Sequence, residues 1–274
     1  MPRGRERMER MTTGLSQKFF ATAFAGVRAE VREGAFDGAR ARDAAMQFVA
    51  DAFPRARCAI LFGSVRSGEQ KAWSDIDVLL VLPGEVAAEK RCAIVAGYPV
   101  EYYLYDVPTL HAALDPATGW AAPTLAAALL GGELIGGDAA LAQSLAQTAR
   151  AFTAAPRPAP AGAALNNARG MATSFMLELA TNPAHDEQVA IAAQLYTLLT
   201  GLVVQKASGV RNGPKWTARL LKQIDPALSE GLQQGLAQLA AGGSPAVFLA
   251  QCETMLERIG GPLWDGYRGP VARG

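Results

Sequence analysis

Two aspartates one residue apart, Asp75 and Asp77, are the residues whose type and spacing most directly suggest chemistry. They stand at the start of an apolar run typical of a β-strand, and side chains along a strand alternate between its faces. Both carboxylates are therefore expected on one side, with Ile76 and Val78 facing the core. Carboxylates this close repel one another unless a cation lies between them, and Mg²⁺ or Mn²⁺ prefers oxygen ligands. The pair predicts a divalent metal site, in which two ions would promote an in-line phosphoryl displacement.

A third carboxylate is expected on a neighbouring strand. Residues 98–105 alternate between apolar residues and polar ones, which places Glu101 on the face away from the core. If this strand lies beside the aspartates, Glu101 can bind metal or accept the proton of an acceptor hydroxyl, and a solvent-facing bystander is the alternative. Asp106 competes for the third position, but Tyr-Asp-Val-Pro favours a cap for a helix beginning near Pro108.

The loop that precedes the aspartates has the composition of a phosphate-binding loop. Gly63 and Ser64 follow a short apolar strand at 59–62. Glycine allows the backbone to approach a phosphate closely, and Ser64 offers a hydroxyl and an amide at an expected helix N-terminus. We expect this loop to hold the triphosphate of an NTP. Arg66 is a further candidate for phosphate contact, with a merely solvated loop charge as the alternative.

The spacing of these residues carries a family resemblance. Gly63-Ser64, ten intervening residues and Asp75-x-Asp77 resemble the signature of the DNA polymerase β-like nucleotidyltransferase superfamily. Arg66, Gly68 and Ser74 fit its small bacterial branch, which includes the minimal and the aminoglycoside nucleotidyltransferases. The resemblance implies nucleotide binding by this loop, including Ser74, and places the third carboxylate of the family on Glu101. It also implies a C-terminal helical bundle that closes over nucleotide and acceptor.

The composition limits the classes of partner that this protein is expected to bind. Twenty-six Lys and Arg residues against twenty-five Asp and Glu give a formal charge of +1, so no global field attracts a long nucleic acid or an anionic membrane. No apolar run approaches the roughly 20 residues of a membrane span. The three cysteines are far apart and only two histidines are present, which argues against a disulfide framework or a zinc site and favours a reducing, cytoplasmic location.

The chain of 274 residues, half of them hydrophobic, is long enough for two domains, and the expected fold class is α+β. A nucleotidyltransferase domain is expected over 1–155, with a small mixed sheet flanked by helices and an amphipathic N-terminal helix from Leu15 to Val31. Three prolines in residues 154–162 break both helix and strand, which places the boundary there. An all-α bundle is expected over 160–274, with helices near 163–181, 186–207, 214–224, 227–240 and 244–259.

A basic stripe is expected on the helix at 214–224. Lys215, Arg219 and Lys222 recur at helical spacing, opposite Trp216, Leu220 and Ile224. The stripe is either a solvated face or a cleft-facing surface that neutralises the triphosphate, which makes Lys215 a candidate nucleotide contact.

Together these features predict a metal-dependent enzyme that moves a nucleoside monophosphate from an NTP, ATP being the expected nucleotide, to an acceptor hydroxyl. The acceptor is expected on a small molecule, and pyrophosphate is released. One alternative is a protein acceptor, as in self- or partner-adenylylation. Another is a non-catalytic antitoxin or regulatory module that binds nucleotide. The sequence does not identify the acceptor, the base or the oligomeric state.

Overall fold

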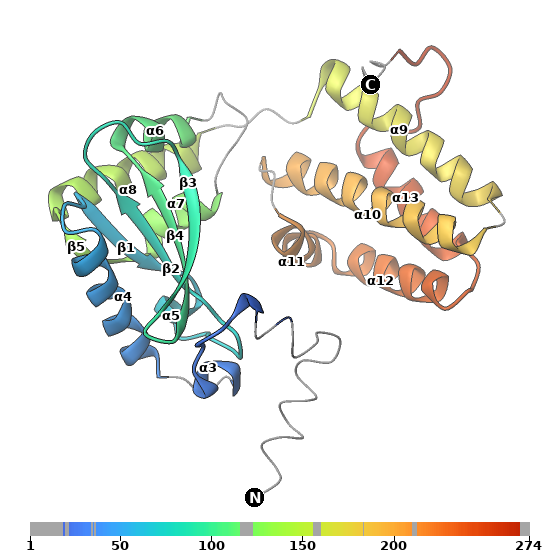
Figure 1. Ribbon diagram of the computed structural model, residues 1–274. Coiled ribbons are helices and arrows are strands. Elements are labelled where there is room, and N and C mark those ends of the chain that lie inside the picture. Colours follow the sequence, from blue (N-terminus) through green and yellow to red (C-terminus); the bar gives the residue numbers. More distant parts are fainter. Residues whose placement is uncertain are drawn as a thin grey trace, which may run out of the picture. The chain divides into compact units, whose positions relative to one another are not determined.

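The computed structural model describes residues 19, 22–33, 35, 37–115, 123–155, 160–182, 184–209 and 213–268. The chain divides into two compact units, Met1–Ala155 and Pro156–Gly274 (Figure 1). The division falls in the proline-containing segment 154–162, of which residues 156–159 lie outside the described ranges. The first unit combines a mixed sheet with helices and the second is helical, so the fold class is α+β, as predicted.

The described part of the first unit contains a five-stranded sheet in the order β3-β4-β2-β1-β5. The strands are β1 (Cys58–Phe62), β2 (Ile76–Val81), β3 (Glu89–Val95), β4 (Tyr98–Tyr105) and β5 (Glu133–Gly137). β2 and β4 run parallel, and the other neighbours pair antiparallel. The sheet is therefore mixed, and β2 and β4 lie side by side at its centre.

Helices cover both faces of this sheet. They are α3 (Ala29–Glu33), α4 (Gly38–Ala52), α5 (Gly63–Ser67), α6 (Val107–Ala113), α7 (Pro123–Gly131) and α8 (Ala139–Ala154). α4 buries Ala41, Ala45 and Val49 against one face. α6, α7 and α8 pack on the other face, with Leu110, Leu129 and Phe152 in a second core cluster. Because apolar side chains are buried on both faces, the central strands are packed between two layers of helices.

Strands β3 and β5 were not expected from the sequence, and both are edge strands. β3 begins with Glu89, Lys90 and Arg91, all exposed, so it lacks the apolar run of a core strand. β5 contains two consecutive glycines, which weaken the sequence pattern of a strand. The sequence did contain one indication of β3. Ala96 and Gly97 form the two-residue turn of a β-hairpin, which implies a strand before β4.

The predicted continuous N-terminal helix from Leu15 to Val31 is wrong at residues 24–28. Residues 24–26 form a bend and turn, with Gly26 at a φ of 83°, residues 27–28 have no regular structure, and α3 begins at Ala29. Positive φ in this segment ends helical geometry. Val27 and Val31 nevertheless bury in the core beside α4, as their apolar spacing indicated. Residues 1–18 lie outside the described ranges.

The second unit has five helices among its described residues, as predicted. They are α9 (Gly162–Thr181), α10 (His185–Ser208), α11 (Pro214–Ile224), α12 (Pro226–Ala240) and α13 (Ala246–Arg258). α10 packs against each of the other four. By length and composition it could cross a membrane, contrary to the sequence expectation. Its apolar residues Leu195, Leu199 and Val203 instead form the core of the bundle, which is the arrangement of a buried central helix.

Candidate active site

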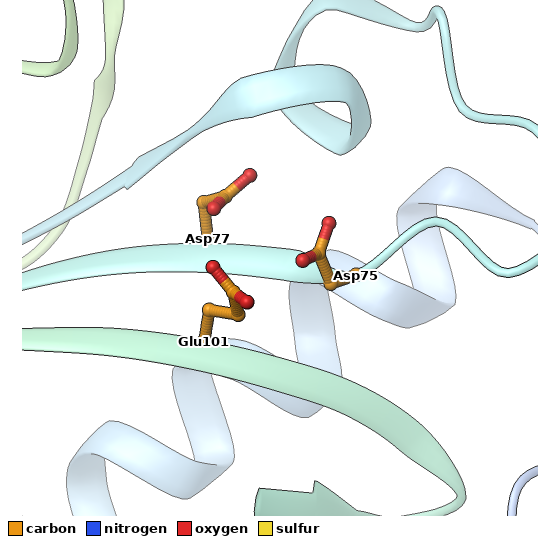
Figure 2. Close-up of side chains that lie close together, drawn as sticks. All are labelled: Asp75, Asp77 and Glu101. Atoms are coloured by element: carbon orange, nitrogen blue, oxygen red, sulfur yellow. The ribbon is translucent and has the colours of Figure 1, made fainter. Parts of the chain in front are cut away.

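Three carboxylates converge at one end of the sheet. Asp75 immediately precedes β2, Asp77 is its second residue, and Glu101 lies directly beside Asp77 on the parallel strand β4. Figure 2 shows their side chains gathered on the same side of the two strands. Each offers an oxygen that lies within 4.8 Å of the others, and all three residues are half-buried. The structure therefore brings together the three acidic residues that the sequence singled out.

Strand alternation places the carboxylate side chains on the face of the sheet opposite α4. Ile76 and Val78, which flank Asp77, are fully buried on the α4 side of the sheet. Val100 is buried on that side as well, so Glu101 must face the opposite way. The apolar residues thus fix the register, since a slip of one residue would bury the carboxylates and expose the core side chains.

The turn before Asp75 is held at two points. The hydroxyl of Ser74 accepts a 2.8 Å hydrogen bond from the backbone N–H of Lys71. Trp73 has a left-handed φ of 62°, and its backbone N–H donates to the carbonyl of Val31 at 2.9 Å. A non-glycine residue at positive φ is strained, and such residues persist where the surroundings hold them. Ser74 thus helps to hold the turn before Asp75, and its predicted role in nucleotide binding stays a prediction.

The glycine of the predicted phosphate loop lies against the carboxylate cluster. Gly63 begins α5 with a φ of 76°, and a Cβ at this position would overlap Oδ2 of Asp77. Ser64 follows on α5, half-buried, and its carbonyl accepts the N–H of Gly68 that caps the helix. α5 has five residues, so the expected helix N-terminus is present as a single short turn beside Asp77.

Lys90 and Tyr103 hold the two oxygens of Glu101. The ammonium of Lys90, on β3, lies 2.7 Å from Oε1, and the hydroxyl of Tyr103 donates to Oε2 at 3.2 Å. The hydrogen bond to Glu101 raises the pKa of Lys90. Burial, followed by the nearby carboxylates, raises the pKa of Tyr103 far above its usual range, so its hydroxyl stays protonated. Lys90 was not predicted because the pairing of β3 with β4 was not foreseen. Tyr103 lies two residues from Glu101 on the same strand, so strand alternation could have placed the two side chains on one face.

Arg66 is engaged with an acidic residue on β5. Its Nε lies 3.9 Å from Oε2 of Glu133, whose other oxygen accepts a 2.7 Å hydrogen bond from Nε of Arg42. The hydrogen bond from Arg42 lowers the pKa of Glu133, so this carboxylate is ionised at neutral pH. The contact described for Arg66 is therefore this ion pair, and its predicted role in phosphate binding stays a prediction.

Asp106 is a helix cap, as its sequence context indicated. Its buried carboxylate accepts the backbone N–H groups of Thr109 and Val86, each at 2.7 Å. These hydrogen bonds, that of Thr109 first, lower the pKa of Asp106. Among the described residues, the group that could hold a metal consists of Asp75, Asp77 and Glu101 and does not include Asp106.

Lys215 lies on α11 of the second unit, apart in the chain from the carboxylates. It is exposed, as are Arg219 and Lys222. The predicted arrangement of this helix needs a correction, because Trp216 is not on a face opposite the basic residues. The guanidinium of Arg219 stacks 5.0 Å from the centroid of the Trp216 ring, which is half exposed. Thr217 and Leu221 are the residues that α11 buries.

A small apolar pocket adjoins the cluster on the same face of the sheet. It measures about 70 Å³ and is lined by Phe62, Leu79, Tyr103, Tyr105, Thr124, Leu125 and Ala128. Ligand pockets commonly enclose about 300–1,000 Å³, so this pocket does not accommodate a nucleoside. It does not identify the acceptor.

A comparison with known proteins found a family match for the segment that contains the carboxylate cluster. Residues 45–109 match the family model of the nucleotidyltransferase domain. This match includes Gly63, Asp75, Asp77 and Glu101, and it extends from α4 to the start of α6. No curated protein matches the chain. A crystal structure of a nucleotidyltransferase-like protein from Exiguobacterium sibiricum matches with 14% identity and a TM-score of 0.41, over 79% of this chain and 74% of that one. A similarity at that level does not bear on function.

A mixed sheet that presents three convergent carboxylates has the donor set of a site that could bind a divalent metal. The family match makes the class more specific, because residues 45–109, which carry this cluster, match the nucleotidyltransferase domain.

Proposed function

We propose that this protein transfers a nucleoside monophosphate from an NTP to a hydroxyl of a small-molecule acceptor, with divalent metal held by Asp75, Asp77 and Glu101. The observation that carries the proposal is the convergence of these three carboxylates within the nucleotidyltransferase domain. Their donor set consists of oxygens alone, which suits Mg²⁺ or Mn²⁺ and disfavours soft metals. Two ions would fit the role of neutralising charge at the attacking and leaving oxygens.

The reaction forms a bond between the acceptor oxygen and the α-phosphorus of the NTP. The bond from that phosphorus to the bridging oxygen breaks, and pyrophosphate leaves with the electron pair. The acceptor hydroxyl loses its proton to a base, for which Glu101 is the candidate. The hydroxyl of Tyr103 donates a hydrogen bond to Oε2 of Glu101. This contact supports a first role for Glu101 as an oriented metal ligand, because oriented carboxylates bind metal more tightly.

The loop from Gly63 to Ser74 is proposed to hold the triphosphate. Gly63 supports this role because its missing side chain leaves the backbone close to Asp77, where the phosphates must meet the metal. A formal charge of +1 supports a small acceptor over a long nucleic acid, whose backbone requires a basic track.

The test is incubation of the full chain and Mg²⁺ with ATP, CTP, GTP or UTP and a panel of metabolites and aminoglycosides. Mass spectrometry of the small molecules and of the intact protein would detect an added monophosphate. The proposal expects a small molecule to gain mass with the parent and none to gain mass with Asp75→Asn or Asp77→Asn, which remove a ligand charge at nearly constant volume. Modification of the protein alone would favour adenylylation, and equal transfer by the aspartate variants would contradict the metal site.

A further inference from the structure

Lys90 reaches the carboxylate cluster from the edge of the sheet. On β3 it pairs with Tyr103, which lies two positions from Glu101 along β4, so its side chain extends diagonally to Oε1 of Glu101. The ammonium lies 5.8 Å from the centroid of the Tyr103 ring. About half of the side chain is exposed. A lysine stem is flexible, so the ammonium can change partner without a change in the backbone.

We propose that Lys90 is the resident cation of the carboxylate cluster. It holds Glu101 in place while no divalent ion is bound, and it moves to the triphosphate when metal and NTP bind. This inference rests on the proposed function, since it assigns Lys90 a positioning role at that same site.

Electrostatics supports the exchange. An oxygen of Glu101 that accepts a hydrogen bond from an ammonium has less negative charge to offer a metal, and a cation next to the cluster repels an incoming one. Lys90 therefore competes with the metal. Once displaced, its ammonium stays on the face of the sheet that carries the carboxylates, where the NTP phosphates must lie to reach them.

Arg91 provides a matched control because it follows Lys90 on the same strand. Its side chain points to the other face, since strand residues alternate, and its register partner Tyr102 packs with the α4-side core. Its guanidinium pairs with Glu89 at 2.8 Å. Arg91 thus carries the same charge and a comparable surface ion pair without contacting Glu101.

The experiment is an Mn²⁺ titration of the full chain, followed by the electron paramagnetic resonance of free Mn²⁺. It compares the parent with Lys90→Met, Lys90→Arg and Arg91→Met, and includes Asp77→Asn to identify binding at the cluster. Each protein is then titrated with a non-hydrolysable NTP analogue at saturating Mn²⁺.

Lys90→Met is expected to bind Mn²⁺ alone about two- to fivefold more tightly, the range of an exposed ion pair. It should bind the analogue at least about fivefold more weakly, because a charge-assisted hydrogen bond to phosphate is lost. Lys90→Arg should recover most of the analogue affinity, and Arg91→Met should behave like the parent. A residue that merely supported the fold would not change these two affinities in opposite directions.

Two results overturn the inference in distinguishable ways. If the parent shows no saturable Mn²⁺ binding that Asp77→Asn removes, the proposed metal site fails and the role of Lys90 with it. If the parent binds Mn²⁺ at the cluster but Lys90→Met does not bind it more tightly, or Arg91→Met tightens binding equally, the resident-cation role fails and the metal site stands.

Discussion

Gly63 and Asp77 lie so close together that a side chain at position 63 and the carboxylate at position 77 exclude one another. A Cβ on Gly63 would overlap Oδ2 of Asp77, and the φ of 76° at this position independently disfavours any side chain. The backbone of the loop and the strand that carries Asp77 are thereby in direct contact. The position of the Asp77 carboxylate therefore requires a glycine at position 63.

Gly63→Ala is expected to abolish metal binding, because Asp77 must move away from the other two carboxylates. Gly68→Ala is the matched control: its φ is 74°, and a Cβ there meets nothing within 4 Å. Both variants should lose about 1–2 kcal/mol of stability from the left-handed backbone. Isothermal titration with Mn²⁺ should show binding for Gly68→Ala and none for Gly63→Ala. Parental affinity in Gly63→Ala would mean that Asp77 can ligate from another position or does not ligate.

Glu101→Gln distinguishes the roles of metal ligand, general base and bystander. We expect metal affinity to fall about 10- to 100-fold and turnover to fall with it. The stability of the metal-free protein should change by less than about 0.5 kcal/mol, because relief of carboxylate repulsion offsets the lost contact with Lys90. Lost turnover at unchanged metal affinity would indicate a base. No change in either quantity would make Glu101 a bystander, and the hydrogen bonds of Asp106 leave that residue a poor substitute.

Cys92 offers a chemical probe of the cluster. It is the exposed one of the three cysteines and lies directly opposite Glu101 on β3. Side chains of opposed strand residues share a face, with Cβ atoms about 4.5–5.5 Å apart. Burial raises the pKa of Cys58 to about 11 and that of Cys252 to about 12, so neither should form a thiolate near neutral pH.

A bulky neutral maleimide at pH 7.5 should therefore modify Cys92 alone, as peptide mass mapping would show. The modified protein should bind the Mn²⁺ and NTP analogue at least about tenfold more weakly, a loss of about 1.4 kcal/mol. Cys92→Ser treated with the same reagent is the control and should bind normally. Unimpaired binding after complete modification of Cys92 would place the substrate away from this edge of the sheet.

Asp106 should contribute to stability in a pH-dependent way and leave metal binding unchanged. Because its pKa in the folded state is lowered from 3.8, its contribution is fully present above that value and is lost as the pH falls through the folded pKa. Asp106→Asn should therefore melt at a lower temperature than the parent at pH 7, and the difference should shrink below about pH 4. Differential scanning calorimetry across pH 3–7 measures this. A difference that persists undiminished at pH 3 would mean that the ionised carboxylate is not the stabilising form.

The face of the sheet on which the carboxylates lie could be predicted from sequence because strand alternation is local. Ile76 and Val78 bury on one side, so Asp77 must lie on the other. The adjacency of Asp77 and Glu101 could not be derived locally. β3 separates their strands in the chain yet pairs outside β4. Strand alternation made Glu101 a candidate, and the family resemblance assigned it the third-carboxylate position.

The contact between Lys90 and Glu101 could not be predicted from the sequence, for a physical reason. Lys90 lies on an exposed edge strand whose polar residues give no apolar pattern. On α11, helical spacing alone placed Trp216 opposite the basic residues, whereas its ring stacks with Arg219 at the surface. In both places the contact is made by an amphipathic side chain. The apolar part of such a side chain packs against the protein while its charged or polar end stays near solvent, so a pattern of apolar residues does not predict its contacts.

A crystal structure of the full chain with Mn²⁺ and a non-hydrolysable NTP analogue would test most directly whether the three carboxylates bind the metal. The anomalous signal of manganese would locate the ion. We predict an anomalous peak among Asp75, Asp77 and Glu101, bonded to their oxygens and to the phosphates of the analogue. The same crystals of Asp77→Asn should lose the peak. A bound analogue whose Mn²⁺ lies away from these carboxylates, or a peak that survives in Asp77→Asn, would contradict the assignment of this cluster as the metal centre of a nucleotidyltransferase.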